Sequence, residues 1–245
     1  MSSTPWFIAA PESWTDAEVT LPADESHHAL KVMRVSPPDV VVVTDGRGRV
    51  ARCAASRVNG DRLVAEILEV EERRPLKPRL VVYQGAAKGQ KIDGIVERLA
   101  ELGVAEVWVY ESSRSVVRWD ESKVAKLGDR WRAIARSAAK QSRSAFVLEA
   151  GGGVSWTELL RRVAKEPHAV VLWEDASLPL RTALVGTTDR VALIVGPEGG
   201  LERTEAEALA DAGAQLVSLG PQILRTENAA VVTVAALQFH YGLLG

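Results

Sequence analysis

The stretch ALIVGPEGGLERTEAEAL, residues 192–209, is an apolar segment that ends in Gly-Pro and continues through a glycine-containing loop to Arg-Thr-Glu. The same order recurs in LVSLGPQILRTENAAV, residues 216–231. Glycine at a strand end allows close approach of a ligand, and proline fixes the turn that follows. Each stretch therefore predicts a strand, a ligand-accessible loop and a helix.

Helix capping is one explanation for the repeated Arg-Thr-Glu. Thr204 with Glu207 fits a capping box, and Thr226 fits a cap for the last helix. Capping does not explain why long loops follow neighbouring strands at the sheet edge where parallel sheets bind ligands. Three loops are expected at this edge, WEDAS (173–177), GPEGG (196–200) and GPQILR (220–225), and the two that contain glycine would form a cleft together.

The expected ligand of this cleft is an adenosine held mainly by backbone groups. GAAKGQKI, residues 85–92, lacks the Gly-Lys-Ser/Thr ending of a phosphate-binding loop, and the chain contains no GxGxxG. These absences argue against a phosphate-rich cofactor.

The chain changes character near residue 72. Before it, a short helix around HHALKVMRV, with a possible cap at Asp24, precedes three strand-like runs, two of them joined at Asn59-Gly60, a strong hairpin signal. After the linker-like EERRPLKPR, strands alternate with helices from Leu80 onward, which predicts a mostly parallel α/β sheet. The helices are expected near residues 90–102, 121–141, 156–165 and 204–212, and from about 226.

The last helix is apolar on nearly all sides. Such a helix needs burial around its whole circumference, in a core or against a second subunit.

Composition limits the function classes. The 245 residues are 47% apolar, enough for a packed core, but no uncharged apolar run reaches the ~20 residues of a membrane span. The N-terminus lacks the pattern of a signal peptide, so we expect a cytoplasmic protein. With one cysteine, Cys53, and four histidines without ligand spacing, neither a disulfide nor a metal site is expected.

Positive charge gathers in the middle of the chain. Residues 73–143 hold 16 Lys+Arg against 8 Asp+Glu, although the net charge is −2. In the predicted helix 121–141, Arg132, Arg136 and Lys140 repeat every four residues, opposite an apolar stripe, and Arg143 extends the row. This row fits either an RNA-binding surface or an ordinary solvated face.

Several motifs resemble a known family in order and spacing. They are HHALKVMR (27–34), AELGV (100–104), SRSV (113–116), AAKQSR (138–143), VGPEGG (195–200) and LGPQILRTENA (219–229). Together they resemble the bacterial 16S rRNA uridine-N3 methyltransferases, the RsmE family of the SPOUT class. The chain departs from the family pattern at Asn228, at Lys140, where an acid is usual, at the position before Arg143, which lacks the common glycine, and at SPPD (36–39), which replaces the usual Gly-Asp.

The resemblance implies a PUA-like RNA-binding barrel over residues 1–72 and a SPOUT methyltransferase domain over residues 73–245. It further implies a trefoil knot that holds S-adenosylmethionine (SAM), a homodimer, and 16S rRNA in the 30S subunit as the partner. No membrane or metal is implied. From sequence rules alone an unknotted sheet would be expected.

The motifs also nominate site residues. The cofactor residues are expected to be Leu172, Trp173, Gly196, Pro197, Glu198, Gly200, Leu219, Gly220, Ile223 and Leu224. RNA contacts are expected at His28, Arg34, Arg132, Arg136 and Lys140. The catalytic candidates are Arg225, Glu227, Arg114 and Arg143.

Removing the proton of uridine N3 leaves negative charge on the ring, which an arginine would stabilise in the transition state. Arg225 fits this role or a contact to loop carbonyls or phosphate. Glu227 fits a proton acceptor or a first-turn helix acid, and Glu198 fits a turn residue, so the general base stays open.

Two other functions fit the same residues. One is a SPOUT enzyme that acts elsewhere, on a ribose 2′-oxygen or on guanine N1. The other is a ribosome-assembly factor that binds RNA without catalysis, which the intact glycines of both loops disfavour.

Overall fold

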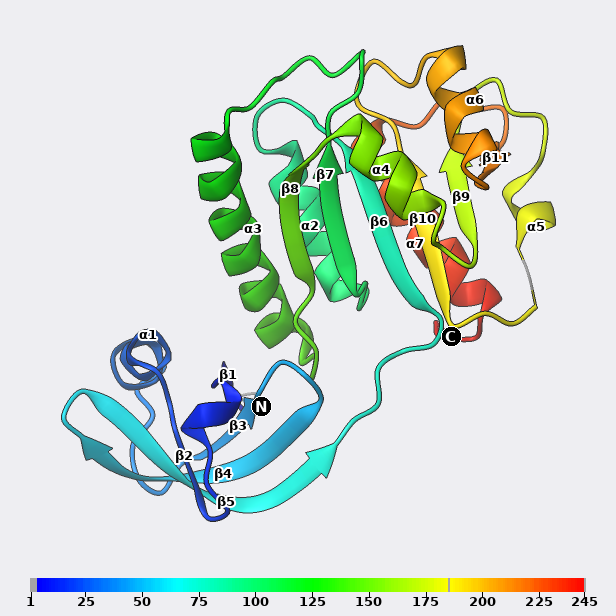
Figure 1. Cartoon of the computed structure of the whole chain (residues 1–245). Coiled ribbons are helices and arrows are strands. Elements are labelled where there is room, and N and C mark those ends of the chain that lie inside the picture. The colour runs from blue at the N-terminus through cyan, green and yellow to red at the C-terminus, as the bar shows by residue number, and fades with distance from the viewer. Residues whose placement is uncertain (1–3, 185, 245) are drawn as a thin grey trace. The chain divides into compact units, whose positions relative to one another are not determined.

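The computed structural model describes residues 4–184 and 186–244 (Figure 1). It divides into two compact units. The first comprises residues 1–75 and 136–147, and the second comprises residues 76–135 and 148–245. Each unit has its own apolar core, which includes Phe7 and Leu63 in the first and Tyr83 and Ile194 in the second.

The first unit is built on a five-stranded sheet in the order β1-β3-β4-β5-β2. Its strands are β1 (Trp6–Ile8), β2 (Glu18–Thr20), β3 (Val40–Thr44), β4 (Arg49–Asn59) and β5 (Arg62–Glu72). The hairpin between β4 and β5 turns where Asn-Gly predicts it, and Gly60 has a φ of +63° that favours glycine. The two three-residue strands β1 and β2 carry too little pattern to be predicted.

Two short helical turns cover this sheet. A 3₁₀ turn, η1 (Pro11–Ser13), precedes α1 (Ala23–His27), which continues as a π-helical turn, η2 (His28–Val32). The expected cap at Asp24 is wrong, because Pro22 occupies the N-cap and places Asp24 inside the first turn. The buried hydroxyl of Ser26 donates to the carbonyl of Leu21 and accepts from the amide of Leu63, which anchors α1 on β5.

The second unit contains six strands in the order β11-β9-β10-β6-β7-β8, and every neighbouring pair is parallel. This arrangement confirms the predicted parallel α/β sheet. The strands are β6 (Arg79–Gly85), β7 (Glu106–Tyr110), β8 (Glu149–Val154), β9 (Ala169–Leu172), β10 (Arg190–Val195) and β11 (Gln215–Val217).

Helices cover both faces of the parallel sheet. They are α2 (Lys91–Glu101), α3 (Glu121–Ser142), α4 (Trp156–Val163), α5 (Leu180–Ala183), α6 (Arg203–Asp211) and α7 (Thr226–His240). α2 and α7 contact each other on one face, and α4 and α6 contact each other on the other (Figure 1). The one-turn helix α5 was not predicted.

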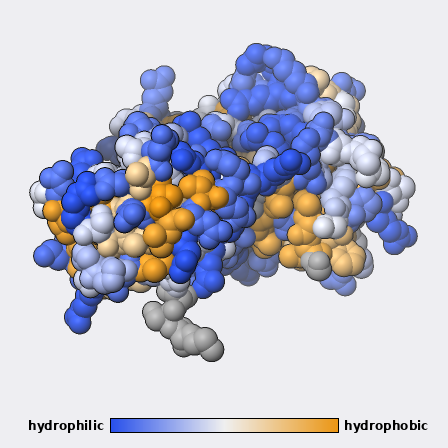
Figure 2. Space-filling model, turned by 90° about the horizontal axis from the view of Figure 1, so that it is seen from below, coloured by the Kyte–Doolittle hydropathy of each residue, from blue (hydrophilic) through white to orange (hydrophobic). Residues whose placement is uncertain are grey.

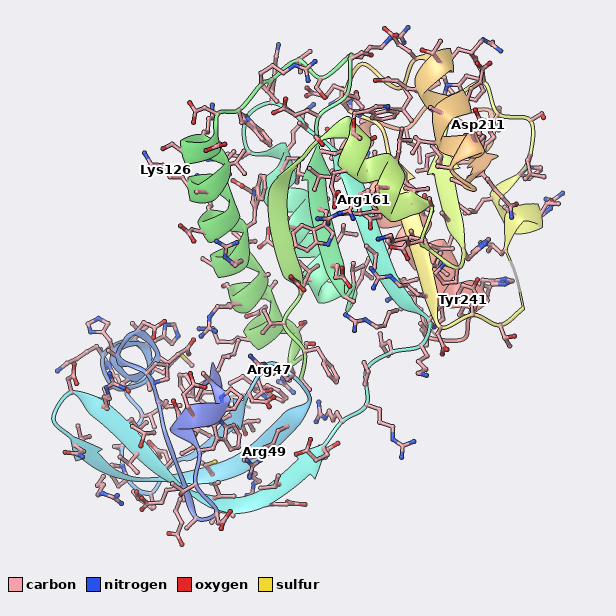
Figure 3. All side chains as sticks on the ribbon, in the orientation of Figure 1. Arg47, Arg49, Lys126, Arg161, Asp211 and Tyr241 are labelled. Carbon is pink, nitrogen blue, oxygen red and sulfur yellow. The ribbon has the colours of Figure 1, made fainter. Side chains whose placement is uncertain are left out.

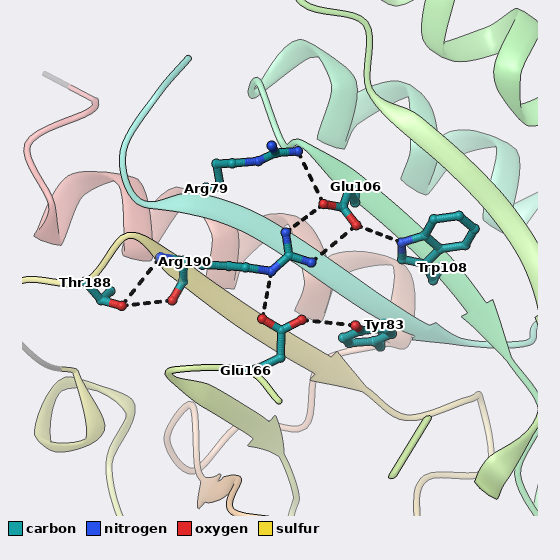
Figure 4. A network of polar contacts seen from close by, with 7 residues as sticks. All are labelled: Arg79, Tyr83, Glu106, Trp108, Glu166, Thr188 and Arg190. Carbon is teal, nitrogen blue, oxygen red and sulfur yellow. Dashed lines mark hydrogen bonds and ion pairs between the residues drawn. The ribbon is translucent and has the colours of Figure 1, made fainter. Parts of the chain in front are cut away.

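A polar network ties together the strand starts at the amino-terminal edge of this sheet (Figure 4). Arg190 donates to both oxygens of Glu106 at 2.7 and 3.3 Å and to Glu166 at 2.7 Å. Burial alone would raise the pKa of Glu106, but hydrogen bonds from Arg190 and Trp108 outweigh burial and lower this pKa. Burial and the neighbouring Glu166 raise the pKa of Tyr83 to about 12. These shifts keep Glu106 ionised and Tyr83 neutral near neutral pH.

The apolar sequence of the last helix predicts burial on every side, but within one chain the helix is buried on only part of its surface. Val234 and Leu237 are fully buried, whereas the side chains of Val232 and Phe239 are 50% and 75% exposed. Figure 2 shows one face of the molecule, on which hydrophobic residues form separate patches between hydrophilic ones. One chain thus leaves part of the apolar surface of α7 uncovered.

Candidate active site

A cavity of about 710 Å³ opens at the carboxyl ends of β9, β10 and β11. All ten residues expected to hold a cofactor line it. Sequence reasoning missed part of its lining, namely Glu174, Asp175, Val195, Leu201, Val217, Ser218, Pro221, Gln222, Thr226 and Ala229. The WEDAS loop was the available signal for Glu174 and Asp175, since it was placed at the same edge. The cavity size lies within the usual range of small-molecule sites, about 300–1,000 Å³.

The first Gly-Pro loop lies against the end of β6. A Cβ atom on Gly85 would lie 2.2 Å from the backbone nitrogen of Pro197, so only glycine fits there. The loop then turns through a hydrogen bond from the amide of Gly200 to the carbonyl of Pro197, with Gly200 at a φ of +72°. This close approach fixes the loop that forms one wall of the cavity.

The second Arg-Thr-Glu binds the two Gly-Pro loops to each other. Thr226 does not cap α7, because Arg225 is the N-cap and its neighbour Thr226 is already the first helical residue. Instead, the Thr226 hydroxyl donates to the carbonyl of Gly196 at 2.7 Å and accepts from the Gln84 amide at 2.8 Å. Thr226 and Gln84 are both buried. The predicted cap at Thr226 is therefore wrong, and the hydroxyl joins the second loop to the first.

The first Arg-Thr-Glu is used differently. The predicted capping box of Thr204 with Glu207 is wrong, because Glu202 is the N-cap of α6 and its box partner is Glu205. The buried carboxylate of Glu205 accepts from the amides of Glu202 at 2.9 Å and Ser113 at 2.7 Å. Glu205 thus completes the capping box of α6 and also holds the loop after β7 through the amide of Ser113.

Three charged side chains meet beside the cavity. The Lys91 ammonium lies 2.5 Å from Glu198 Oε1 and 3.7 Å from Glu227 Oε2. The hydrogen bond between Lys91 and Glu198 raises the pKa of the lysine and lowers that of the carboxyl. Glu198 lines the cavity, whereas Glu227 does not. Lys91, at the start of α2, therefore links Glu198 of the first Gly-Pro loop to Glu227, which follows the second.

Family models match both units of the chain. A model of the RNA methyltransferase PUA domain matches residues 21–68, and a model of the RNA methyltransferase domain matches residues 74–238. The ribosomal RNA small subunit methyltransferase E of Mycobacterium bovis is 36% identical over 227 residues, 91% of this chain and 87% of the relative. This chain belongs to the methyltransferase E family, RsmE. The Bacillus subtilis member is 30% identical over 92% of this chain and 91% of its own.

Solved structures agree with this assignment to RsmE. The chain is similar to the RsmE of Neisseria gonorrhoeae bound to SAM, with a TM-score of 0.82, 29% identity, and coverage of 97% of this chain and 98% of the other. It is also similar to a methyltransferase of Legionella pneumophila in complex with SAM, with a TM-score of 0.88, 27% identity and the same coverage. The family comparison thus confirms a PUA-like domain followed along the chain by an RNA methyltransferase domain.

The catalytic candidates lie in different places within this RsmE chain. The exposed Arg225 lines the cavity. Arg114 donates to the carbonyl of Gly199 at 3.4 Å, beside the first Gly-Pro loop, and its Nε lies 3.7 Å from Glu202. Arg143 is an exposed residue of the first unit, with a φ of +57° after α3, so its role at the cavity stays a prediction.

Three of the five RNA-contact candidates form ion pairs within the chain. His28 and Arg34 are exposed in the first unit. Arg136 and Lys140 instead lie 3.8 and 2.9 Å from one carboxylate oxygen of Glu25, whose side chain is 3% exposed.

Arg132 pairs with Asp129 at 2.7 Å, one turn earlier on α3. The regular basic row of α3 is therefore partly a set of ion pairs, and its contact with RNA stays a prediction.

Neither a metal site nor a membrane span is found in the part of the chain that the structure describes. Residues 4–184 and 186–244 contain no group of three His, Cys, Asp or Glu that could hold a metal ion. Over the same residues, each helix is too short or too polar to cross a bilayer.

Proposed function

We propose that this protein transfers the methyl group of SAM to N3 of a single uridine near the 3′ end of 16S rRNA, in the 30S subunit. One observation carries the proposal, namely that the ten residues nominated for the cofactor line a single cavity of about 710 Å³. Membership of the RsmE family and the SAM bound in two similar structures support it.

The cavity walls fit an adenosine cofactor. Backbone groups of the loops and apolar side chains such as Leu172 and Leu224 would hold the adenine, as in many mostly apolar sites. The carboxylates of Glu174 and Asp175 at the end of β9 are suited to accept hydrogen bonds from ribose hydroxyl groups. Bound SAM supplies an electrophilic methyl group, and no metal is needed for this transfer.

Arg225 is the proposed catalytic residue. Arg225 lines the cavity, and its guanidinium would stabilise the negative charge that develops on the uracil ring as N3 loses its proton. Arg114, beside the first loop, is placed to contact RNA phosphate or the same ring. We propose that Glu227 anchors the second loop through Lys91 rather than accepting the proton, because its carboxylate is not part of the cavity wall.

The finer proposals are a cytoplasmic location, a knotted backbone and a homodimer. The knot is supported by the close crossing of the first loop over Gly85 and by the bonds of Thr226 to both segments. The dimer is supported by the exposed apolar side chains of Val232 and Phe239 on α7, a helix that also contributes to the buried core. Phe239→Glu should therefore convert a dimer into monomers in sedimentation velocity, whereas a monomeric wild type would exclude this interface.

Methyl transfer to isolated subunits tests the function directly. The purified protein is incubated with isotope-labelled SAM and 30S subunits from a strain that lacks this modification, and the labelled nucleoside is mapped by mass spectrometry. A single 3-methyluridine in 16S rRNA is expected. Label on a sugar or on guanine would refute the uridine specificity but keep the methyltransferase, and an absence of transfer to any rRNA despite SAM binding would refute the substrate.

A further inference from the structure

A second cavity, of about 170 Å³, lies in the same unit of the protein. It is lined by the loop after β6, the start of α2, the loop after β7 and the start of α3. Its lining residues are Ala87, Gly89, Ile92, Asp93, Val117, Trp119, Lys123, Leu127 and Trp131. Both loops follow the carboxyl ends of parallel strands, which is the edge where such sheets bind ligands.

The loop after β6 connects the two cavities. Ala87 and Gly89 line the small cavity, while between them the backbone amide of Lys88 donates to Glu198 of the large cavity at 3.3 Å. Lys91, just before Ile92, holds the same carboxylate. The cavities share no lining residue. A molecule in the small cavity would thus be a close neighbour of the cofactor without touching it.

The walls of the small cavity suit a flat aromatic ring. The rings of Trp119 and Trp131 lie 5.8 Å apart and are tilted by 55°, and Trp131 is buried whereas Trp119 is half-buried. A cavity of about 150 Å³ is known to hold benzene, so about 170 Å³ admits one six-membered ring. Half-buried tryptophan offers a face on which such a ring can stack.

The polar groups of the cavity add a cation and an acceptor. The exposed Lys123 makes no ion pair with any residue in 4–184 or 186–244, so its charge is available to a phosphate or a ring carbonyl. Asp93 binds Trp131 Nε1 at 3.1 Å and Arg130 at 2.5 Å, and a carboxylate can accept further N–H groups. An aromatic wall, a cation and an acceptor together match an unpaired nucleobase.

We propose that this cavity binds one unpaired base of the RNA substrate, next to the methylated uridine. The inference rests on the proposed function. The bound base is a neighbour of the target rather than the target itself, because the target nitrogen must come within about 3–3.5 Å of the methyl group and the two cavities share no lining residue. Enzymes that modify a base take it out of the stack and often read the flanking nucleotides.

The first test measures methylation of unmodified 30S subunits by variants of the cavity. Trp119→Ala removes the stacking face and Val117→Phe fills the space. Each should raise KM for the subunit by about 5- to 140-fold, the range of one base–aromatic stack, with kcat and the Kd for SAM unchanged. Trp119→Phe should restore most of the affinity. KM values within twofold of wild type in both variants, with intact SAM binding, would overturn the inference.

The cation has a matched control on the same helix. Lys126, labelled in Figure 3, is an exposed lysine of α3 that does not line the cavity. Lys123→Ala should raise KM several-fold while Lys126→Ala leaves it near wild type. Equal losses in the two variants would indicate general charge attraction and would contradict a built site.

The outcome is separable from failure of the proposed function. Binding of a fluorescein-labelled, single-stranded RNA is measured by anisotropy with the same variants, so the cavity is tested even if no methyl transfer to 30S subunits is found. Loss of RNA affinity in Trp119→Ala and Val117→Phe, but not in Trp119→Phe, supports the site independently of catalysis. Unchanged RNA affinity in both overturns it.

Discussion

The hydroxyl of Thr226 offers a sharp test of how the cofactor cavity is held together. Thr226→Val keeps the shape of the side chain and removes only the hydroxyl. The change leaves two groups without this partner, namely the carbonyl of the half-buried Gly196 and the side-chain amide of the buried Gln84. Gln84 keeps one weaker bond, to the carbonyl of Gly85 at 3.2 Å.

The expected cost follows from these two groups. A buried polar group that loses its partner costs about 1–3 kcal/mol, and the remaining bond of Gln84 and the added methyl group offset part of it. We expect a loss of about 3 kcal/mol in the free energy of unfolding. For a chain of this size, this loss lowers Tm by roughly 6–12 °C. If half of this cost also weakens SAM binding, because the loops lose the geometry that holds the cofactor, the Kd for SAM rises by about tenfold.

The assays are urea unfolding and calorimetric titration with SAM. Thr226→Ser, which retains the hydroxyl, should restore most of the stability and affinity. Thr204→Val is the matched control, because Thr204 occupies the same place in the first Arg-Thr-Glu but is exposed. It should change stability by less than about 0.5 kcal/mol. If Thr226→Val is as stable as Thr204→Val, the hydroxyl does not join the two loops and the reasoning is refuted.

Three further predictions address other contacts. Gly85→Ala places a Cβ atom 2.2 Å from the backbone of the first Gly-Pro loop, so the variant should lose SAM binding in a titration, and tight binding would contradict the crossing. Lys91→Met should raise the Kd for SAM about fivefold by releasing Glu198, because solvent weakens this partly exposed ion pair and limits the effect. Lys91→Arg should keep the affinity, and equal Kd values for Lys91→Met and wild type would contradict a role of the lysine. Hydrogen bonds from Arg190 lower the pKa of Glu106 in the folded protein. The stability that the Glu106 carboxylate contributes is therefore complete above its ordinary pKa of 4.5 and is lost as pH falls through the lowered value. The stability gap between wild type and Glu106→Gln, measured by urea unfolding, should be constant from pH 7 to 5 and shrink below 4.5, and a gap that stays constant would contradict the ion pair.

The local sequence pattern was sufficient to predict most helices and strands of the second unit. The long helix α3 begins at Glu121, as predicted, and ends one residue beyond the expected Gln141. The strands of the parallel sheet were predicted because each is an apolar run between turn residues. The strands β1 and β2 were not, because three residues show no alternation and depend on pairing with distant partners.

The features that the sequence did not predict depend on contacts between residues far apart in the chain. Thr226 and Gln84 are 142 residues apart, so the statistical preference of threonine for helix caps was the only local guide, and it was wrong. Lys140 and Glu25 are separated by 115 residues, and their ion pair changes the interpretation of the basic row on α3. The cavity lining was predicted more fully, because a glycine-rich loop at a strand end marks a ligand site by its local composition.

The order of synthesis has a bearing on the cofactor cavity. One of its walls consists of residues 217–226 and Ala229, which are made after the first Gly-Pro loop, and the hydroxyl that joins the loops is made with them. A nascent chain that ends within α6 carries the first loop but lacks the second, and so it cannot enclose SAM. The cavity therefore becomes complete only after translation has passed Ala229.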